Sequence, residues 1–202
     1  MMTAEQMKAV ADAVKALAAP ATVDFSEVVY ESETFPNSFK SNANLAGIVF
    51  PQNVTATASA AFQKTGMTSV TVLKDISYGS NAFDSCASLV SVTVEEGVTE
   101  IGNYMFQNTK LTDVTLPNSV TKIGASAFNG CSLTTINFGQ GVKTIENSAF
   151  QNCGELTEII LPDATETLGQ NAFGDCPKLA KISLGKNMKT LEAYCFVGYS
   201  KG

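Results

Sequence analysis

The hydrophobic positions of this chain recur about every 22 residues, and each repeat is marked by a phenylalanine. Self-similarity at such a period is typical of a solenoid, in which each repeat forms one coil. One coil is too small to bury its own apolar side chains, but stacked coils share a continuous core. We therefore expect the aromatic rings to stack inside the protein. The marker positions are Phe39, Phe62, Phe83, Phe106, Phe128, Phe150, Phe173 and Phe196.

Five or six residues after each phenylalanine come three apolar positions, and the last two of them alternate with a polar residue. Leu111, Val114 and Leu116 form one such set. Alternation with a period of two predicts a short β-strand that has one inward side and one solvent-facing side. About seven coils with parallel strands are expected between residues 39 and 202.

A second apolar pattern, V-x-x-I-G, follows the predicted strand, as at Val98, Ile101 and Gly102. Its apolar residues should also point inward. In the coil between Phe62 and Phe83, Tyr78 stands where isoleucine is expected. We expect a distorted turn in that coil.

The segment Leu111 to Cys131 reads L-x-x-V-x-L-P-x-x-V-x-x-I-G-x-x-A-F-x-x-C. It resembles the BspA-like, or Treponema pallidum type, leucine-rich repeat, and similar segments cover about residues 39 to 196. The resemblance implies a leucine-rich-repeat solenoid with short parallel β-strands on the concave face and turns and short helical segments on the convex side. It also implies a secreted or cell-surface protein, used for adhesion or protein–protein interaction.

Residues 1–20 are expected to form an N-terminal capping α-helix, because terminal coils of solenoids need a cover. Thr3 and Gln6 fit a capping box, and Pro20 should end the helix. A partner-binding helix is the alternative. Residues 21–38 should form an irregular segment that leads into the solenoid of residues 39–202. The expected apolar face of the helix consists of Met7, Val10, Val14 and Leu17.

At the other end, an uncovered last coil would expose apolar side chains and strand edges. We expect further coils or domains beyond Gly202. The alternative is that Tyr194 and Tyr199 fold over the end as a small cap.

The chain has no histidine, which removes the commonest general base together with Ser-His-Asp and Cys-His sites. Hydrolysis by a pair of carboxylates remains formally possible with Asp113, Glu158 and Glu95, but these residues lie on separate coils. We predict a protein that is not an enzyme and needs no cofactor. The five cysteines lack the close spacing of zinc ligands, so no metal site is predicted, and we interpret them as buried free thiols.

A net charge of −6 argues against nucleic acid and against anionic membrane surfaces as partners. No apolar run approaches the roughly 18 to 20 residues that span a bilayer. Asp12 and Lys15 interrupt the apolar stretch from Met7 to Pro20, which therefore does not read as a signal peptide.

The outward positions of the predicted strands form two columns, and these are the candidate partner-binding surface. Weak packing constraint alone would also explain why these positions vary. They contain no Trp, Tyr or Arg, so modest affinity for a protein or glycan on a host or neighbouring cell is expected. The alternative is a rigid structural spacer that presents another domain. The candidate residues are Ser91, Thr93, Asp113, Thr115, Thr135, Asn137, Glu158, Ile160, Lys181 and Ser183.

Overall fold

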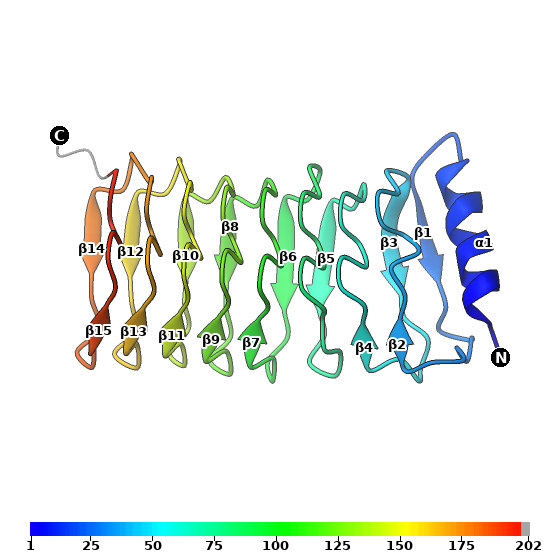
Figure 1. The fold of residues 1–202 in the computed structure, drawn as a ribbon, viewed down its shortest axis with the longest axis horizontal. Coiled ribbons are helices and arrows are strands. Elements are labelled where there is room, and N and C mark those ends of the chain that lie inside the picture. Colours follow the sequence, from blue (N-terminus) through cyan, green and yellow to red (C-terminus); the bar gives the residue numbers. More distant parts are fainter. Residues whose placement is uncertain (199–202) are drawn as a thin grey trace.

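The structure is a computed structural model that describes residues 1–198. It is a parallel β-solenoid whose coils follow one another in a single row, with helix α1 (Ala4–Lys15) at the N-terminal end (Figure 1). The solenoid expected from the repeat is confirmed.

One side of the solenoid, which we call the long-strand face, carries one strand from each coil. Adjacent strands on this face are parallel where they pair, and their side chains alternate between outside and core, as in β8 with its buried Val114. The segment of residues 21–38 supplies the first of these strands. The strands are β1 (Ala21–Asp24), β3 (Leu45–Val49), β5 (Ser69–Val72), β6 (Ser91–Val94), β8 (Asp113–Thr115), β10 (Thr135–Asn137), β12 (Glu158–Ile160) and β14 (Lys181–Ser183).

A second side, the short-strand face, consists of two-residue strands, and the V-x-x-I pattern forms three of them, at Ile101, Ile123 and Ile145. Five of them join into one parallel sheet in the order β15-β13-β11-β9-β7. Each of the four members from β7 to β13 turns one fully buried isoleucine or leucine inward. The strands of this face are β2 (Thr34–Phe35), β4 (Ala56–Thr57), β7 (Glu100–Ile101), β9 (Lys122–Ile123), β11 (Thr144–Ile145), β13 (Thr167–Leu168) and β15 (Thr190–Leu191).

The coil that contains Tyr78 interrupts the short-strand face. Among the described residues, only an isolated bridge between Ala56 and Ser77 joins this coil to β4. The regular strand pairing of the short-strand face is therefore lost in the coil for which a distorted turn was predicted.

The phenylalanines line the third side of the coil. Residues with a left-handed backbone conformation flank most of the rings. Ser126 (φ 52°) and Gly130 (φ 70°) lie two residues on either side of Phe128. The N–H groups of Ser126, Phe128 and Gly130 donate to the next coil at 3.0, 2.8 and 2.9 Å. The rings of Phe128 and Phe150 stack at 5.2 Å with an interplanar angle of 7°. The predicted buried column of rings is confirmed.

The cysteines lie beside this column and are buried without forming disulfides within residues 1–198. The thiol of Cys131 donates to the carbonyl of Phe106 at 3.1 Å and also contacts the hydroxyl of Thr109. Burial raises the pKa of Cys131 and that of Cys176 to about 11. These side chains fill space in the core as neutral thiols.

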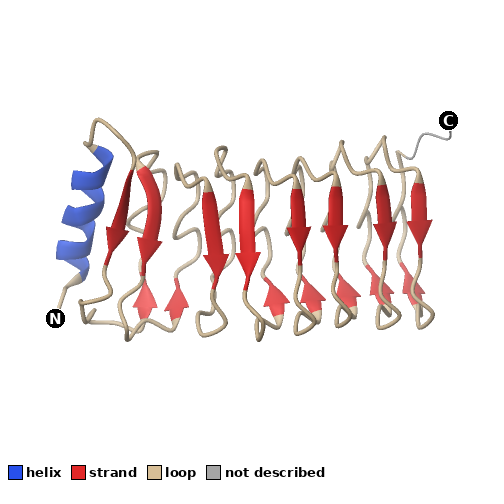
Figure 2. Cartoon of the chain, turned by 180° about the vertical axis from the view of Figure 1, so that it is seen from behind, coloured by secondary structure: helices blue, strands red, loops and turns tan. Residues whose placement is uncertain are grey.

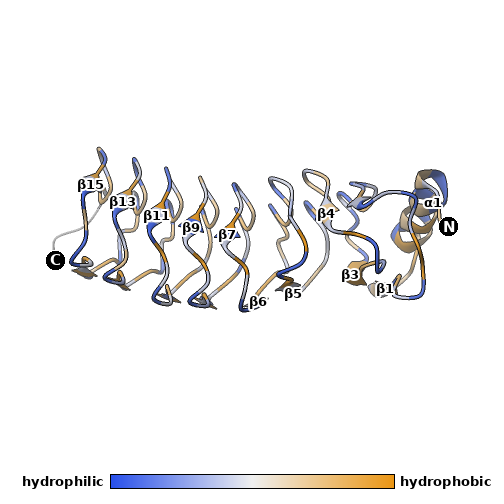
Figure 3. Ribbon diagram, turned by 90° about the horizontal axis from the view of Figure 1, so that it is seen from below, coloured by the Kyte–Doolittle hydropathy of each residue, from blue (hydrophilic) through white to orange (hydrophobic). Residues whose placement is uncertain are grey.

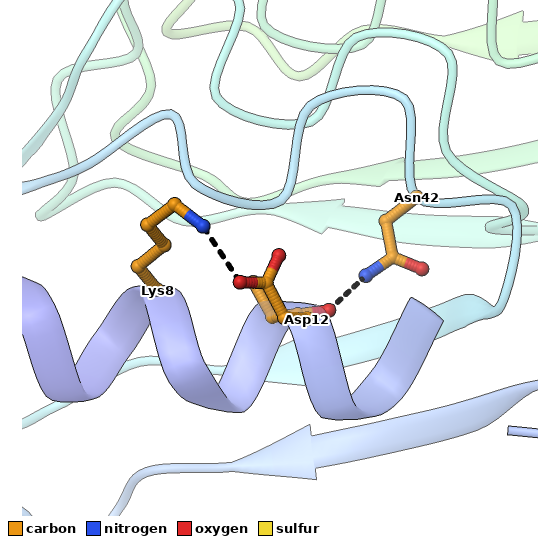
Figure 4. Close-up of polar contacts among 4 residues, drawn as sticks. Lys8, Asp12 and Asn42 are labelled. Atoms are coloured by element: carbon orange, nitrogen blue, oxygen red, sulfur yellow. Dashed lines mark hydrogen bonds and ion pairs between the residues drawn. The ribbon is translucent and has the colours of Figure 1, made fainter. Parts of the chain in front are cut away.

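Helix α1 covers the first coil with Met7, Ala11 and Val14. The capping box is present, since the Thr3 hydroxyl accepts from the N–H of Gln6 at 3.3 Å. Asn42, from the first regular coil, donates to the carbonyl of Ala11 at 2.9 Å (Figure 4).

The prediction that Leu17 belongs to the buried face of the helix is wrong. Helix α1 ends at Lys15, well before Pro20, and Leu17 is 45% exposed. The amide of Asn44 donates to the carbonyls of Lys15 and Leu17 at 3.0 and 2.8 Å, and so caps the helix at this point.

In the last coil, Leu184, Leu191 and Val197 are exposed. Tyr194 is 62% exposed and does not fold over the end, and Tyr199 lies outside the described residues. No helix in residues 1–198 is both long and apolar enough to cross a bilayer.

Candidate functional site

All ten candidate residues lie on the long-strand face, and the predicted columns exist. Asp113 is in register with Thr135, and Glu158 is in register with Lys181. Their side chains are exposed or partly exposed, whereas the residues between them point into the core. The columns thus present one position of every coil side by side, although their role in binding stays a prediction.

The long-strand face is not one continuous sheet. Its strands join in four parallel pairs, namely β1-β3, β5-β6, β8-β10 and β12-β14. The hydrogen-bonded ladder is interrupted between β3 and β5, between β6 and β8, and between β10 and β12. Figure 2 shows the strands of this face as a row of separate arrows. Sequence reasoning treated the face as uniform and did not predict these breaks.

A groove of about 540 Å³ lies at the break between β10 and β12. It brings together four candidate residues from two coils, namely Thr135, Asn137, Glu158 and Ile160. Gln140, Thr157 and Pro162 also line it, and none of these three was predicted as a site residue. The turn after one strand and the residue before the next therefore contribute to the site.

Phe138 lies beneath this groove. Val94, Leu116 and Leu161 occupy the equivalent inward position in other coils, so Phe138 is larger than its counterparts. Its ring is 2% exposed and reaches Phe173 of the next coil, with the ring centroids 6.4 Å apart. The ring thus occupies space between two coils directly below the break.

The main chain also differs at this point. The N–H of Leu116 donates to the main-chain carbonyl of Asn137 at 2.8 Å, and the N–H of Leu161 donates to that of Ser183 at 2.9 Å. Within residues 1–198, no equivalent bond joins Phe138 to Ile160. The size of Phe138, visible in the sequence against a column of Val and Leu, is the signal that could have located the groove.

A second groove, of about 370 Å³, lies at the break between β3 and β5, and Ser91 and Thr93 are among its lining residues. Phe50 lines this groove, holds the position equivalent to Phe138, and has its ring centroid 6.4 Å from that of Tyr78 in the next coil. An aromatic residue thus accompanies both grooves. The break between β6 and β8 has no such residue, and nothing in the structure explains it.

The charged groups of the face form one ion pair rather than a reactive cluster. Glu158 accepts from Lys181 at 2.9 Å, with the two side chains 40% and 61% exposed. Such an exposed pair contributes at most about 1 kcal/mol to stability, because water competes with it. Asp113 lies on β8, two strands away from Glu158 on β12, so the two carboxylates do not face each other across a common pocket.

What the groove offers to a ligand is hydrogen bonding and apolar contact. The carbonyl oxygen of the Asn137 side chain accepts from the N–H of Gly139 at 3.1 Å, which orients the amide. Ile160 is 56% exposed beside it. In residues 1–198, no group of three or more His, Cys, Asp or Glu side chains is placed to hold a metal ion.

The family model for the BspA type leucine rich repeat region matches the chain in six copies, over residues 22–78 and 76–201. The match covers most of the sequence and includes both grooves. No curated protein matches the chain.

Several solved structures share the fold. A leucine-rich repeat protein from Eubacterium ventriosum is 20% identical over 84% of this chain, with a TM-score of 0.53. The pneumococcal vaccine antigen PcpA is 19% identical over 82% of it, with a TM-score of 0.50. The chain spans 53% of each of these two proteins.

A leucine rich cell surface protein from Faecalibacterium prausnitzii is 21% identical over 88% of this chain and 68% of its own, with a TM-score of 0.48. Identities at this level show the likeness of the fold alone.

Proposed function

Because the chain belongs to the family of BspA type leucine-rich repeat proteins, we propose that it is a non-enzymatic binding module of a secreted or cell-surface protein. Repeats of this kind serve as scaffolds for protein–protein interaction. In this proposal the long-strand face holds a protein or glycan of a host or neighbouring cell, and several coils contribute contacts of modest strength.

The groove between β10 and β12 is the observation that carries the proposal. Small-molecule and peptide sites are typically concave, with an apolar lining and a few placed polar groups. Here Thr135, Asn137 and Glu158 supply the polar groups, and Ile160 supplies exposed apolar surface. The support for a secreted or cell-surface location is membership of the family.

The proposal is tested on an array of extracellular-matrix proteins, host-cell glycoproteins and glycans. The chain is compared with a variant in which Asp113, Glu158 and Lys181 are changed to alanine. A matched control changes Glu100, Lys143 and Glu192, which are exposed on or next to the short-strand face. Both variants remove two acidic residues and one lysine, so non-specific charge effects are equal.

We expect a partner that binds the chain and the control variant but not the long-strand variant. Loss of binding in both variants would indicate a charge effect rather than a site. A folded chain that binds nothing on the array would contradict the proposal and favour a rigid spacer that presents another domain.

A further inference from the structure

We propose that the groove between β10 and β12 takes an extended peptide segment of the partner, in which a basic residue and an aliphatic residue are separated by one position. This inference rests on the proposed function, because it names the part of the long-strand face that holds the partner and the chemistry of the segment held there.

The spacing follows from β12 itself. Glu158 and Ile160 are two residues apart on this strand, and both line the groove. Alternate residues of a strand point to the same side and lie about 6.5 to 7 Å apart. A peptide extended alongside β12 has the same repeat, so its alternate side chains reach a carboxylate and an aliphatic side chain in turn.

The neutral lining suits a peptide main chain. The NH₂ group of Asn137 has no hydrogen-bond partner among residues 1–198, and neither does the hydroxyl of Thr135 or of Thr157. The N–H of Phe138 lacks the bond to the next coil that Leu116 and Leu161 make. Amide and hydroxyl groups of this kind pair with the N–H and C=O groups of an extended segment.

The charge of the groove selects a basic side chain. Glu158 is its one charged lining residue, and the whole chain carries a net charge of −6. Lys181 already contacts Glu158, but a pair this exposed is weak and can be displaced or shared. An arginine of the partner can bind the carboxylate through two parallel hydrogen bonds.

The apolar lining favours an aliphatic side chain over a sugar. Ile160 is 56% exposed, and Pro162 also lines the groove. The aromatic residue of the groove, Phe138, is only 2% exposed and cannot serve as a stacking platform for a sugar ring. A glycan would therefore lose its main apolar contact here.

The experiment uses three seven-residue peptides, blocked at both ends and identical except at the centre. The first has Arg-Thr-Ile, the second has Glu-Thr-Ile, and the third has Arg-Ile-Thr, which places the two side chains on opposite sides of an extended chain. Each is titrated into the ¹⁵N-labelled protein, and amide chemical shifts are followed by NMR.

We expect the Arg-Thr-Ile peptide to shift resonances of residues 135–140 and 157–162, and to bind at least about threefold more tightly than the other two peptides. Equal binding of the three peptides, shifts located elsewhere, or no shifts at millimolar peptide would overturn the inference. So would shifts in this groove produced by an oligosaccharide set and not by the peptides.

Variants test the groove directly. Ile160→Ser should lower the affinity for the Arg-Thr-Ile peptide about tenfold, and Glu158→Gln should lower it about two- to fivefold. Phe138→Leu should also weaken binding, because it removes the ring that lies between the coils. Leucine holds the equivalent position in Leu116 and Leu161, so this variant should fold. Phe50→Leu, at the other groove, is the matched control and should leave peptide binding unchanged.

The two proposals can fail separately. If a partner found on the array is lost in the Asp113, Glu158 and Lys181 variant but binds normally to Ile160→Ser and Phe138→Leu, the face binds a partner and the groove is not its site. If the peptide binds the groove while the array yields no partner, the groove chemistry stands and the proposed cell-surface role falls.

Discussion

The long-strand face and the short-strand face are built from the same coils, yet only the short-strand face contains a long unbroken sheet. On the short-strand face, β7 to β15 form an unbroken five-stranded sheet, whereas the long-strand face is divided into pairs. The inward column below the continuous sheet contains only isoleucine and leucine. The column below the divided face mixes valine, leucine and phenylalanine. Side chains of similar size within a column keep the spacing between adjacent coils constant, because protein interiors are closely packed.

Tyr78 supports the same explanation from the opposite direction. It stands directly before the run of isoleucine and leucine residues in the column of the short-strand face, and the sheet of that face is interrupted there. Phe50 and Phe138 accompany the two grooves of the long-strand face. Tyr78, Phe50 and Phe138 thus each accompany a break in strand pairing, whereas Phe35 of β2 does not, because β2 still pairs with β4. The breaks at Phe50 and Phe138 supply concave surface on a protein that is otherwise a regular stack.

The largest effect should come from the ring column that both faces share. Phe128→Ala is expected to lower the free energy of unfolding by about 3 to 5 kcal/mol, because it leaves a cavity between the stacked rings of Phe106 and Phe150. Urea unfolding followed by circular dichroism measures this change. A cost below about 1 kcal/mol would mean that the ring is not part of the core.

A smaller loss of stability is expected from a substitution that interrupts the sheet of the short-strand face. Ile123→Phe places an aromatic residue on β9, between the isoleucines of β7 and β11 in its uniform column. Overpacking of this kind costs about 1 to 3 kcal/mol, and it should also separate β9 from one neighbour. Amide hydrogen exchange of residues 121–124 measures the separation. Unchanged protection of these amides would contradict the link between ring size and the breaks.

Much of this architecture could be predicted from the sequence, because the same pattern of residues recurs in every repeat. The period, the inward phenylalanines and the alternation around Val114 place each strand, and the capping box at Thr3 begins the helix. These features depend on local pattern, which a single sequence contains in full.

The breaks and the groove could not be predicted in the same way, because they depend on contacts between coils. Phe138 and Leu116 were both interpreted as apolar residues that point inward, and only their size differs. Gln140 and Thr157 became site residues because the coils separate there. Leu17 was misplaced because Asn44, distant in sequence, ends the helix.

A smaller effect is expected from the pH dependence of Tyr78. Burial raises the pKa of Tyr78 to about 12, above the ordinary value of about 10. Its neutral form therefore stabilises the folded chain below pH 10, and this contribution is lost as the pH rises from about 10 to about 12.

The loss should be on the order of 1 kcal/mol between pH 9 and pH 11. Tyr78→Phe removes the titrating group while keeping the ring, so the difference in thermal midpoint between the two proteins isolates this residue from the buried cysteines. Identical pH dependence of both proteins would mean that Tyr78 is open to water and does not separate the coils of the short-strand face.

The smallest effect should come from the outer surface of the long-strand face. Thr115 is exposed on β8 and lies in register with Asn137 of β10. Thr115→Ala removes a hydroxyl and a methyl group that contact mainly solvent, so the cost should stay within about 0.5 kcal/mol. Denaturant unfolding of this variant beside Phe128→Ala compares the outside of a coil with its inside. Equal and small changes in both variants would mean that the inward and outward positions have been exchanged. A large loss of stability at Thr115 alone would mean that the hydroxyl holds β8 and β10 together. The outward columns would then stabilise the solenoid as well as contact a partner.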